Sequence, residues 1–90
     1  MKQFHEIPHL RGFKVKFICP TNNRGARVKI TDIHNNVSII QSYNYSDGAS
    51  EGQAFNHLQS LGIEVSSFSV NDKTGESLLL SDNFDIKLKP

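Results

Sequence analysis

The sequence predicts a single α+β domain, in which one helix packs on one face of an antiparallel sheet. Residues 13–45 alternate apolar and polar side chains with the period of strands, whereas apolar residues between Ser46 and Gly62 follow helical spacing. Strand-like alternation then returns, which gives the order βββ-α-ββ. With 90 residues the chain is too short for two domains. We therefore expect an N-terminal arm over residues 1–12 and one domain over residues 13–90.

The first two strands are expected to form a hairpin. Phe13, Val15 and Phe17 alternate with lysines, which predicts a half-buried strand that ends near Cys19. Pro20–Gly25 contains the residues that favour turns and is expected to be the hairpin loop. The second strand follows from Ala26, where apolar residues again alternate with charged ones.

A third strand is expected after a tight turn at Asn35-Asn36, because Asn tolerates the positive φ that such turns require. A two-residue turn would place four pairs of residues opposite each other: Val28 with Tyr43, Ala26 with Tyr45, Lys29 with Ser42, and Arg27 with Asn44. In this register both tyrosines lie on the face that the helix covers. A slip by one residue would instead place them on the open surface.

The helix is expected from the spacing of four apolar residues, Ala54, Phe55, Leu58 and Leu61. Ser50 and Gln53 have the spacing of a capping box at its start, and Gly62 stands where a glycine commonly ends a helix. Strands are then expected over Ile63–Val70 and Ser77–Ser81, with a bulge between Val65 and Phe68. A short last strand could follow, because Phe84, Ile86 and Leu88 alternate once more.

No motif in the sequence predicts catalysis. His5-Glu6-Ile7-Pro8-His9 has the letters of a zinc protease motif, but Pro8 would disrupt the helix that this motif requires. Cys19 has no histidine at a spacing that predicts a nucleophile and its base, and is expected to be a buried or edge thiol. Phosphate-binding glycine loops and calcium-loop spacings are missing from the sequence. We therefore expect a protein that is not an enzyme and has neither a cofactor nor a metal site.

Two short segments resemble known sequences. The run Pro20-Thr21-Asn22-Asn23-Arg24-Gly25-Ala26-Arg27-Val28-Lys29-Ile30, together with Gly62-Ile63-Glu64, resembles small uncharacterised proteins of bacterial phages and mobile elements. The resemblance covers a small part of the chain and implies a prokaryotic accessory protein without assigning an activity. A cytoplasmic location is expected, because the single cysteine suits a reducing compartment and no secretory signal or membrane span is evident.

Charge is distributed unevenly along the chain. Residues 1–30 hold seven Lys and Arg and one Glu, a net charge of +6, whereas residues 31–90 hold three Lys and eight acids, a net charge of −5. The predicted hairpin would place its cations on one open face of the sheet, where they could bind phosphates by counterion release. The candidate nucleic-acid-binding residues are Arg11, Lys14, Lys16, Arg24, Arg27, Lys29, Ser42 and Asn44.

Three interpretations of this basic face remain open from the sequence. Duplex DNA is the favoured partner, because no aromatic residue alternates with the cations to stack on unpaired bases. An acidic protein could dock on the same face or pair with a sheet edge. The lysines could also belong to an ordinary solvated face that resists edge-to-edge aggregation. The oligomeric state is not determined by any of these patterns.

Overall fold

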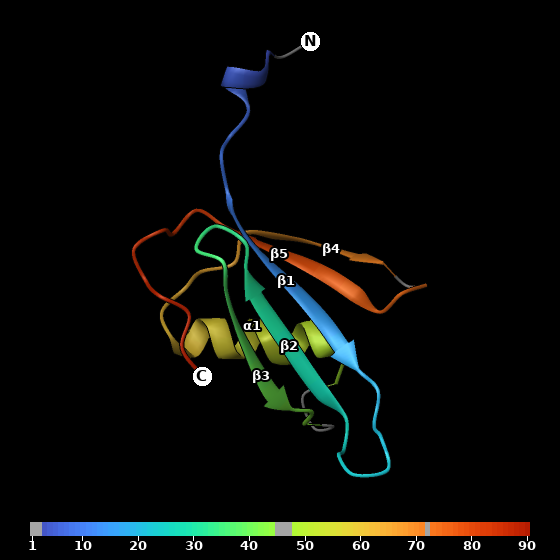
Figure 1. The fold of residues 1–90 in the computed structure, drawn as a ribbon. Coiled ribbons are helices and arrows are strands. Elements are labelled where there is room, and N and C mark those ends of the chain that lie inside the picture. The colour runs from blue at the N-terminus through green and yellow to red at the C-terminus, as the bar shows by residue number, and fades with distance from the viewer. Residues whose placement is uncertain (1–2, 45–47, 72) are drawn as a thin grey trace.

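The computed structural model describes residues 3–44, 48–71 and 73–90, which form an α+β domain with one five-stranded antiparallel sheet. Its elements are a short 3-10 helix η1 (Phe4–Glu6), β1 (Arg11–Ile18), β2 (Arg27–Asp32), β3 (Val37–Ser42), α1 (Ser50–Ser60), β4 (Ser67–Asn71) and β5 (Glu76–Ser81). The strand order is β3-β2-β1-β5-β4, so β1 is central and β3 and β4 are the two edges. Figure 1 shows α1 lying across one face of this sheet.

The predicted three-strand meander is present, but its second register was wrong by two residues. Val28 lies opposite Gln41 and Arg27 opposite Ser42, rather than opposite Tyr43 and Asn44. The loop between β2 and β3 contains four residues, 33–36, of which Asn36 has a positive φ of 57°. Because a shift by two preserves the alternation of side chains, the residues that lie within β2 and β3 remain on their predicted faces.

Aromatic residues of the meander lie on the helix-facing side, as the sequence predicted for those that are described. Tyr43 contacts Phe17 with ring centroids 5.1 Å apart, and it packs against the core from beyond the end of β3. Tyr45 and its predicted pairing with Ala26 lie outside the described residues. No register slip brings Tyr43 to the open face.

The buried core lies between α1 and the sheet. Phe13, Val15, Val28 and Ile30 are fully buried beneath Ala54 and Leu58 of the helix. The face of the sheet opposite α1 faces solvent, and the edge strand β4 is largely exposed, since even Phe68 on its helix-facing side is 67% exposed. The predicted arrangement of one helix on one face is therefore confirmed.

The helix ends as predicted but begins differently. Gly62 has a φ of 90°, and its N–H donates to the carbonyl of Gln59 while the N–H of Ile63 donates to the carbonyl of Leu58, as in a Schellman motif. The predicted capping box was wrong, because the residue before the helix is Ala49 and no side chain caps it. Gln53 instead bridges to the end of β3, donating from Nε2 to the carbonyl of Ser42 at 3.0 Å.

The segment after the helix also departs from the prediction. β4 begins at Ser67 rather than Ile63, so Val65 lies in the connection and no bulge is needed to reconcile it with Phe68. Ile63 is fully buried in this connection. Pairing with β5 then places Phe68 opposite Leu79.

Residues 82–90 form no strand, so the predicted last strand was wrong. Their apolar side chains instead pack along the helix side of the domain, where Leu88 is buried and Ile86 is half-buried. A contact of 2.5 Å between His57 Nε2 and the carbonyl of Lys89 joins this tail to α1. The segment acts as a cover for the core rather than as a sheet edge.

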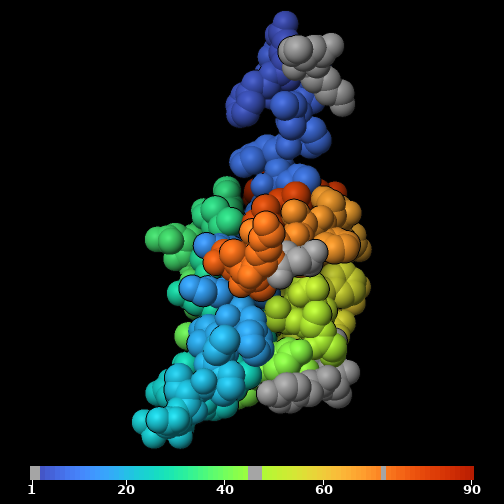
Figure 2. Space-filling view, turned by 90° about the vertical axis from the view of Figure 1, so that its right-hand side faces the viewer, coloured from blue at the N-terminus to red at the C-terminus, as the bar shows by residue number. Residues whose placement is uncertain are grey.

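Both ends of β1 lead to protruding segments. The arm extends away from the sheet, and Phe4 within it is 90% exposed (Figure 2). β1 begins at Arg11, two residues before the predicted start at Phe13. At the opposite end of the molecule the loop between β1 and β2 projects beyond the sheet (Figures 1 and 2). No helix in the described part of the chain is long and apolar enough to cross a membrane.

Candidate functional site

The candidate site is the half of the open sheet face nearest the β1–β2 loop, which we call the basic face. It is defined by Lys14 and Lys16 of β1 and by Arg27 and Lys29 of β2, as the alternation of side chains predicts. The antiparallel register places all four on the side of the sheet opposite α1. Both β1 lysines are exposed, whereas Arg27 and Lys29 are half-buried.

At the centre of the basic face two like charges stand directly opposite each other. Lys16 of β1 pairs with Lys29 of β2. Side chains of directly opposed residues in an antiparallel pair lie close together, and like charges in this position destabilise the sheet. On its other side Lys29 is paired with Ile40 of β3, so its cross-strand neighbours provide no compensating acid.

One acid, which the sequence analysis did not assign to this face, moderates the charge of β1. Glu76 at the start of β5 lies opposite Lys16, and its Oε2 is 3.3 Å from Nζ of Lys14. The ion pair is exposed to solvent and is therefore expected to be weak. Its position could have been found only from the pairing of β5 with β1, which local sequence patterns do not reveal.

Arg24 and Arg27 lie at the end of the basic face nearest the β1–β2 loop. Arg24 is exposed in the β1–β2 loop, where its backbone N–H donates to Oγ1 of Thr21 at 3.2 Å. The Nε atom of Arg27 is buried and makes no hydrogen bond within the described structure. Together with Gly25, Ala26, Ser42 and Tyr43 they line a surface hollow.

Two of the predicted polar residues differ in their placement. Ser42 is exposed at the end of β3 and lies opposite Arg27 rather than Lys29. Asn44 follows the end of β3, and its backbone N–H donates to Oε1 of Gln53 at 2.8 Å. The expectation that a strand would carry Asn44 onto the basic face was therefore wrong.

Arg11 was predicted to belong to the basic face, and this was also wrong. It shares the inward alternation of Phe13, and its side chain is completely buried. Its guanidinium group donates to both carboxylate oxygens of Asp32, at 3.4 Å and 2.6 Å, and to the main-chain carbonyls of Asn83 and Ile86. Arg11 is thus committed to the interior and cannot contact an external phosphate in this conformation.

Asp32 joins this buried pair to the β2–β3 loop. Its carboxylate accepts hydrogen bonds from the backbone N–H groups of His34 and Asn35 and from the side chain of Asn35. Burial acts to raise the pKa of Asp32, but the hydrogen bonds from Arg11 and Asn35 and the charge of Arg11 hold it below its ordinary value of 3.8. The ionised pair therefore fixes both the loop and the C-terminal tail to the sheet.

The other half of the open face is apolar, which the sequence analysis did not foresee. Leu78 and Leu80 of β5 flank Gly12 of β1, and a side chain at Gly12 would meet both of them and Ile33. Ile33 is 56% exposed. The open face therefore has a basic half beside the β1–β2 loop and an apolar half beside the β2–β3 loop.

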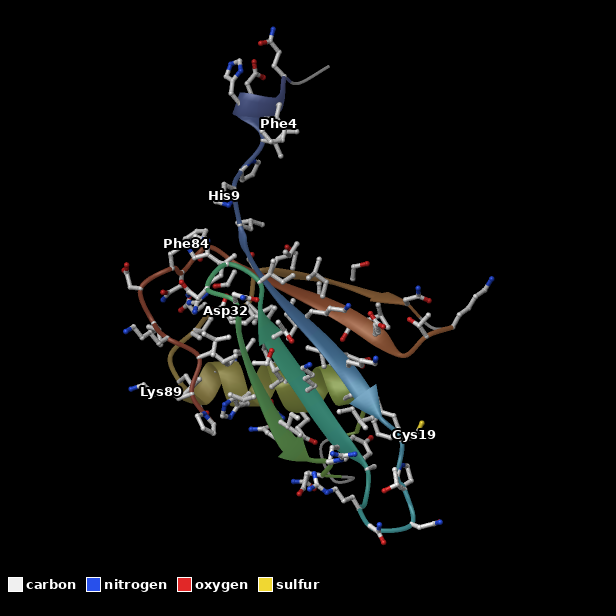
Figure 3. All side chains as sticks on the ribbon, viewed as in Figure 1. Phe4, His9, Cys19, Asp32, Phe84 and Lys89 are labelled. Atoms are coloured by element: carbon white, nitrogen blue, oxygen red, sulfur yellow. The ribbon has the colours of Figure 1, made fainter. Side chains whose placement is uncertain are left out.

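The cysteine and the histidines do not gather into a reactive cluster in the described part of the chain. Cys19 is exposed at the end of β1, near the base of the loop (Figure 3). His9 and His34 contact Phe84 where the arm meets the domain, with ring centroids 5.4 Å and 5.0 Å from the Phe84 ring. No group of three or more His, Cys, Asp or Glu among the described residues could hold a metal ion.

Comparisons with protein-family models, curated proteins and solved structures found no match to this chain.

Proposed function

We propose that this protein binds nucleic acid without catalysing a reaction, and that it contacts backbone phosphates through the basic face. The observation that carries the proposal is the opposition of Lys16 and Lys29. Placing two cations side by side is unfavourable in the free protein, and a polyanion that bridges them removes this repulsion. Glu76 compensates the charge of β1 on one side, whereas Lys29 and Arg27 have no acid as a cross-strand partner.

Duplex DNA is the preferred partner, because the described aromatic side chains of the meander do not lie on the open face. Stacking on single strands uses aromatic side chains on an open sheet face. Phe13 and Phe17 alternate to the helix-facing side, and Tyr43 packs there as well. The protruding β1–β2 loop (Figure 2) would let Arg24 approach the backbone or a groove beyond the edge of the sheet.

The test is binding of fluorescein-labelled duplex DNA, single-stranded DNA and RNA, measured by anisotropy between about 50 and 200 mM salt. If Arg24 and the four cations of the basic face each contact one phosphate, the slope of log affinity against log salt is about −4.5 for B-DNA. The affinity then falls roughly 500-fold across this range. No binding at low salt to any of the three would overturn the proposal.

Variants assign the binding to the basic face. The double variant Lys16→Gln/Lys29→Gln is expected to reduce the magnitude of the salt slope by about two units. The matched control is Lys87→Gln/Lys89→Gln, which removes the same charge from exposed residues of the C-terminal tail. Equal losses in the two double variants would show that net charge alone, and not the basic face, determines affinity.

An acidic protein is the second candidate partner, and the apolar half of the open face favours it. Protein interfaces combine an apolar centre with a polar rim, and Leu78, Leu80 and Ile33 lie beside the lysines on the same surface. The double variant Leu78→Ser/Leu80→Ser would then abolish capture of the partner, whereas DNA binding through phosphates would be nearly unaffected. Pull-down with this variant and with Lys16→Gln/Lys29→Gln separates the two candidates.

A further inference from the structure

The hollow at the end of the basic face nearest the β1–β2 loop has a lining whose chemistry suits an anion. Its volume is about 410 Å³, and it is lined by the Gly25-Ala26 segment that leads from the loop into β2 and by Ser42 and Tyr43 at the end of β3. These two segments are joined by the N–H of Tyr43, which donates to the carbonyl of Ala26 at 2.9 Å.

Its lining selects for negative charge. Arg24 and Arg27 contribute two guanidinium groups and Ser42 contributes a hydroxyl, while the described lining contains no carboxylate. The two hollows beside the start of α1, by contrast, are both lined by Glu51. Guanidinium groups bind phosphate with pairs of parallel hydrogen bonds, which lysines cannot make.

Arg27 carries a donor that the protein itself leaves without an acceptor. Its Nε atom is shielded from solvent and makes no hydrogen bond within the described structure. A buried N–H group without a partner is costly, and buried donors in folded proteins are nearly always satisfied. An oxygen of an anion bound in the hollow would provide the missing acceptor once the Arg27 side chain shifts to expose this N–H group.

The loop that carries Arg24 contains a hydrogen-bonded turn. The N–H of Thr21 donates to the carbonyl of Arg24 at 2.8 Å, and the N–H of Arg24 donates to Oγ1 of Thr21 at 3.2 Å. These reciprocal bonds restrict the backbone of Arg24, a residue that lines the hollow. A preorganised loop loses less conformational entropy on binding than a free one.

We propose that this hollow is a phosphate-binding site in which Arg24, Arg27 and Ser42 hold a single phosphate group. Where that phosphate is a phosphodiester of bound nucleic acid, the site rests on the proposed function. The phosphodiester would then lie at the end of the basic face and fix the register of the complex. A terminal or free phosphate presents the same oxygens and is the other source of this chemistry.

The first experiment uses inorganic phosphate alone and does not depend on nucleic acid. ¹⁵N-labelled protein is titrated with phosphate at constant ionic strength, and the expected result is a saturable shift of the Arg27 Nε–H signal and of the Gly25 and Ala26 amides. Ser42→Asp, which places a carboxylate in the hollow, should abolish the shift. The control Ser38→Asp adds the same charge on the same face of β3 and should retain it. Shifts that are absent, or lost equally in both variants, would overturn the site.

The second experiment compares Arg27→Lys in β2 with Lys87→Arg in the exposed C-terminal tail, two substitutions that both preserve charge. Loss of the paired hydrogen bonds should weaken duplex binding by Arg27→Lys roughly tenfold, while Lys87→Arg, which lies outside the basic face, binds as the unaltered protein does. Duplexes with and without a 5′-phosphate distinguish the two sources, because an effect that requires the 5′-phosphate assigns the hollow to chain ends. Equal binding by both variants would overturn the site in the complex but leave the proposed function standing. Phosphate shifts at Arg27 without any nucleic-acid binding would overturn the proposed function and support the site for free phosphate.

Discussion

Replacing Asp32 by Asn should destabilise the protein far more than any change on the open face. Arg11 and Asp32 are both completely buried, and their closest contact is 2.6 Å. The substitution preserves the shape of the side chain but leaves the guanidinium charge of Arg11 buried without a counterion. Removing one member of such a pair costs about 3–5 kcal/mol.

This loss is large beside the total stability of the domain. At roughly 0.05–0.15 kcal/mol per residue, a chain of 90 residues has about 5–13 kcal/mol of unfolding free energy. For a domain of this size the loss corresponds to a fall in Tm of about 4–8 °C per kcal/mol. Asp32→Asn should therefore unfold at a much lower temperature. If the unfolding free energy lies at the low end of its range and the loss at the high end, the variant is largely unfolded at room temperature.

The assay is urea unfolding followed by far-ultraviolet circular dichroism, with Glu76→Gln as the control. Glu76 forms the exposed ion pair with Lys14, and its loss should cost less than about 1 kcal/mol. The double variant Arg11→Met/Asp32→Leu should be more stable than Asp32→Asn, because it leaves no buried charge. It should not reach the unaltered protein, since the carbonyls of Asn83 and Ile86 lose their donor. If Asp32→Asn and Glu76→Gln were equally stable, the buried pair would not anchor the fold.

Three further outcomes follow from the same contacts. The pKa of Asp32 is lowered in the folded state, so its stabilising contribution is present above the ordinary value of 3.8 and is lost as the pH falls through the folded-state value. Urea midpoints should therefore fall more steeply on acidification in the unaltered protein than in Asp32→Asn. Parallel curves for the two proteins would contradict this. Gly62→Ala should cost about 1 kcal/mol or more in thermal unfolding, because the residue has a φ of 90° and the new Cβ would lie 3.1 Å from Cδ1 of Ile86; unchanged stability would exclude the Schellman ending of α1. Lys29→Gln should stabilise the free protein by about 0.2–1 kcal/mol while weakening DNA binding, and a less stable Lys29→Gln protein would argue that the opposed lysines do not repel each other.

The sequence predicted which face each residue of the meander would occupy, because alternation depends only on local side-chain chemistry. Lys14, Lys16, Arg27 and Lys29 were therefore placed correctly on one open face. The register could not be predicted from Asn35-Asn36 alone. Asp32 lies at the end of β2 and accepts hydrogen bonds from His34 and Asn35, which produces a four-residue loop instead of a two-residue turn.

What the sequence missed depends on contacts between distant segments. Arg11 shares the inward alternation of Phe13, but a charged residue at that position is expected at the surface unless a buried partner is known. That partner, Asp32, is 21 positions away along the chain. Glu76 and the two leucines of the apolar half, Leu78 and Leu80, come from β5, whose place beside β1 is set by the long connection through α1 and β4. Gln53 was predicted to be part of a capping box, because its hydrogen bond to the carbonyl of Ser42 in β3 joins residues that are distant in the sequence.

The most direct test of the central claim is to map where a short duplex DNA binds, using amide chemical shifts of the ¹⁵N-labelled protein at low salt. Binding through the basic face predicts that the largest shifts fall on β1 and β2 at Lys14, Lys16 and Lys29, and extend to the loop at Arg24. Amides of α1, on the opposite side of the sheet, should be nearly unchanged. Shifts concentrated on α1 or on the C-terminal tail, or no shifts at all at low salt, would contradict the assignment of the basic face as a nucleic-acid interface.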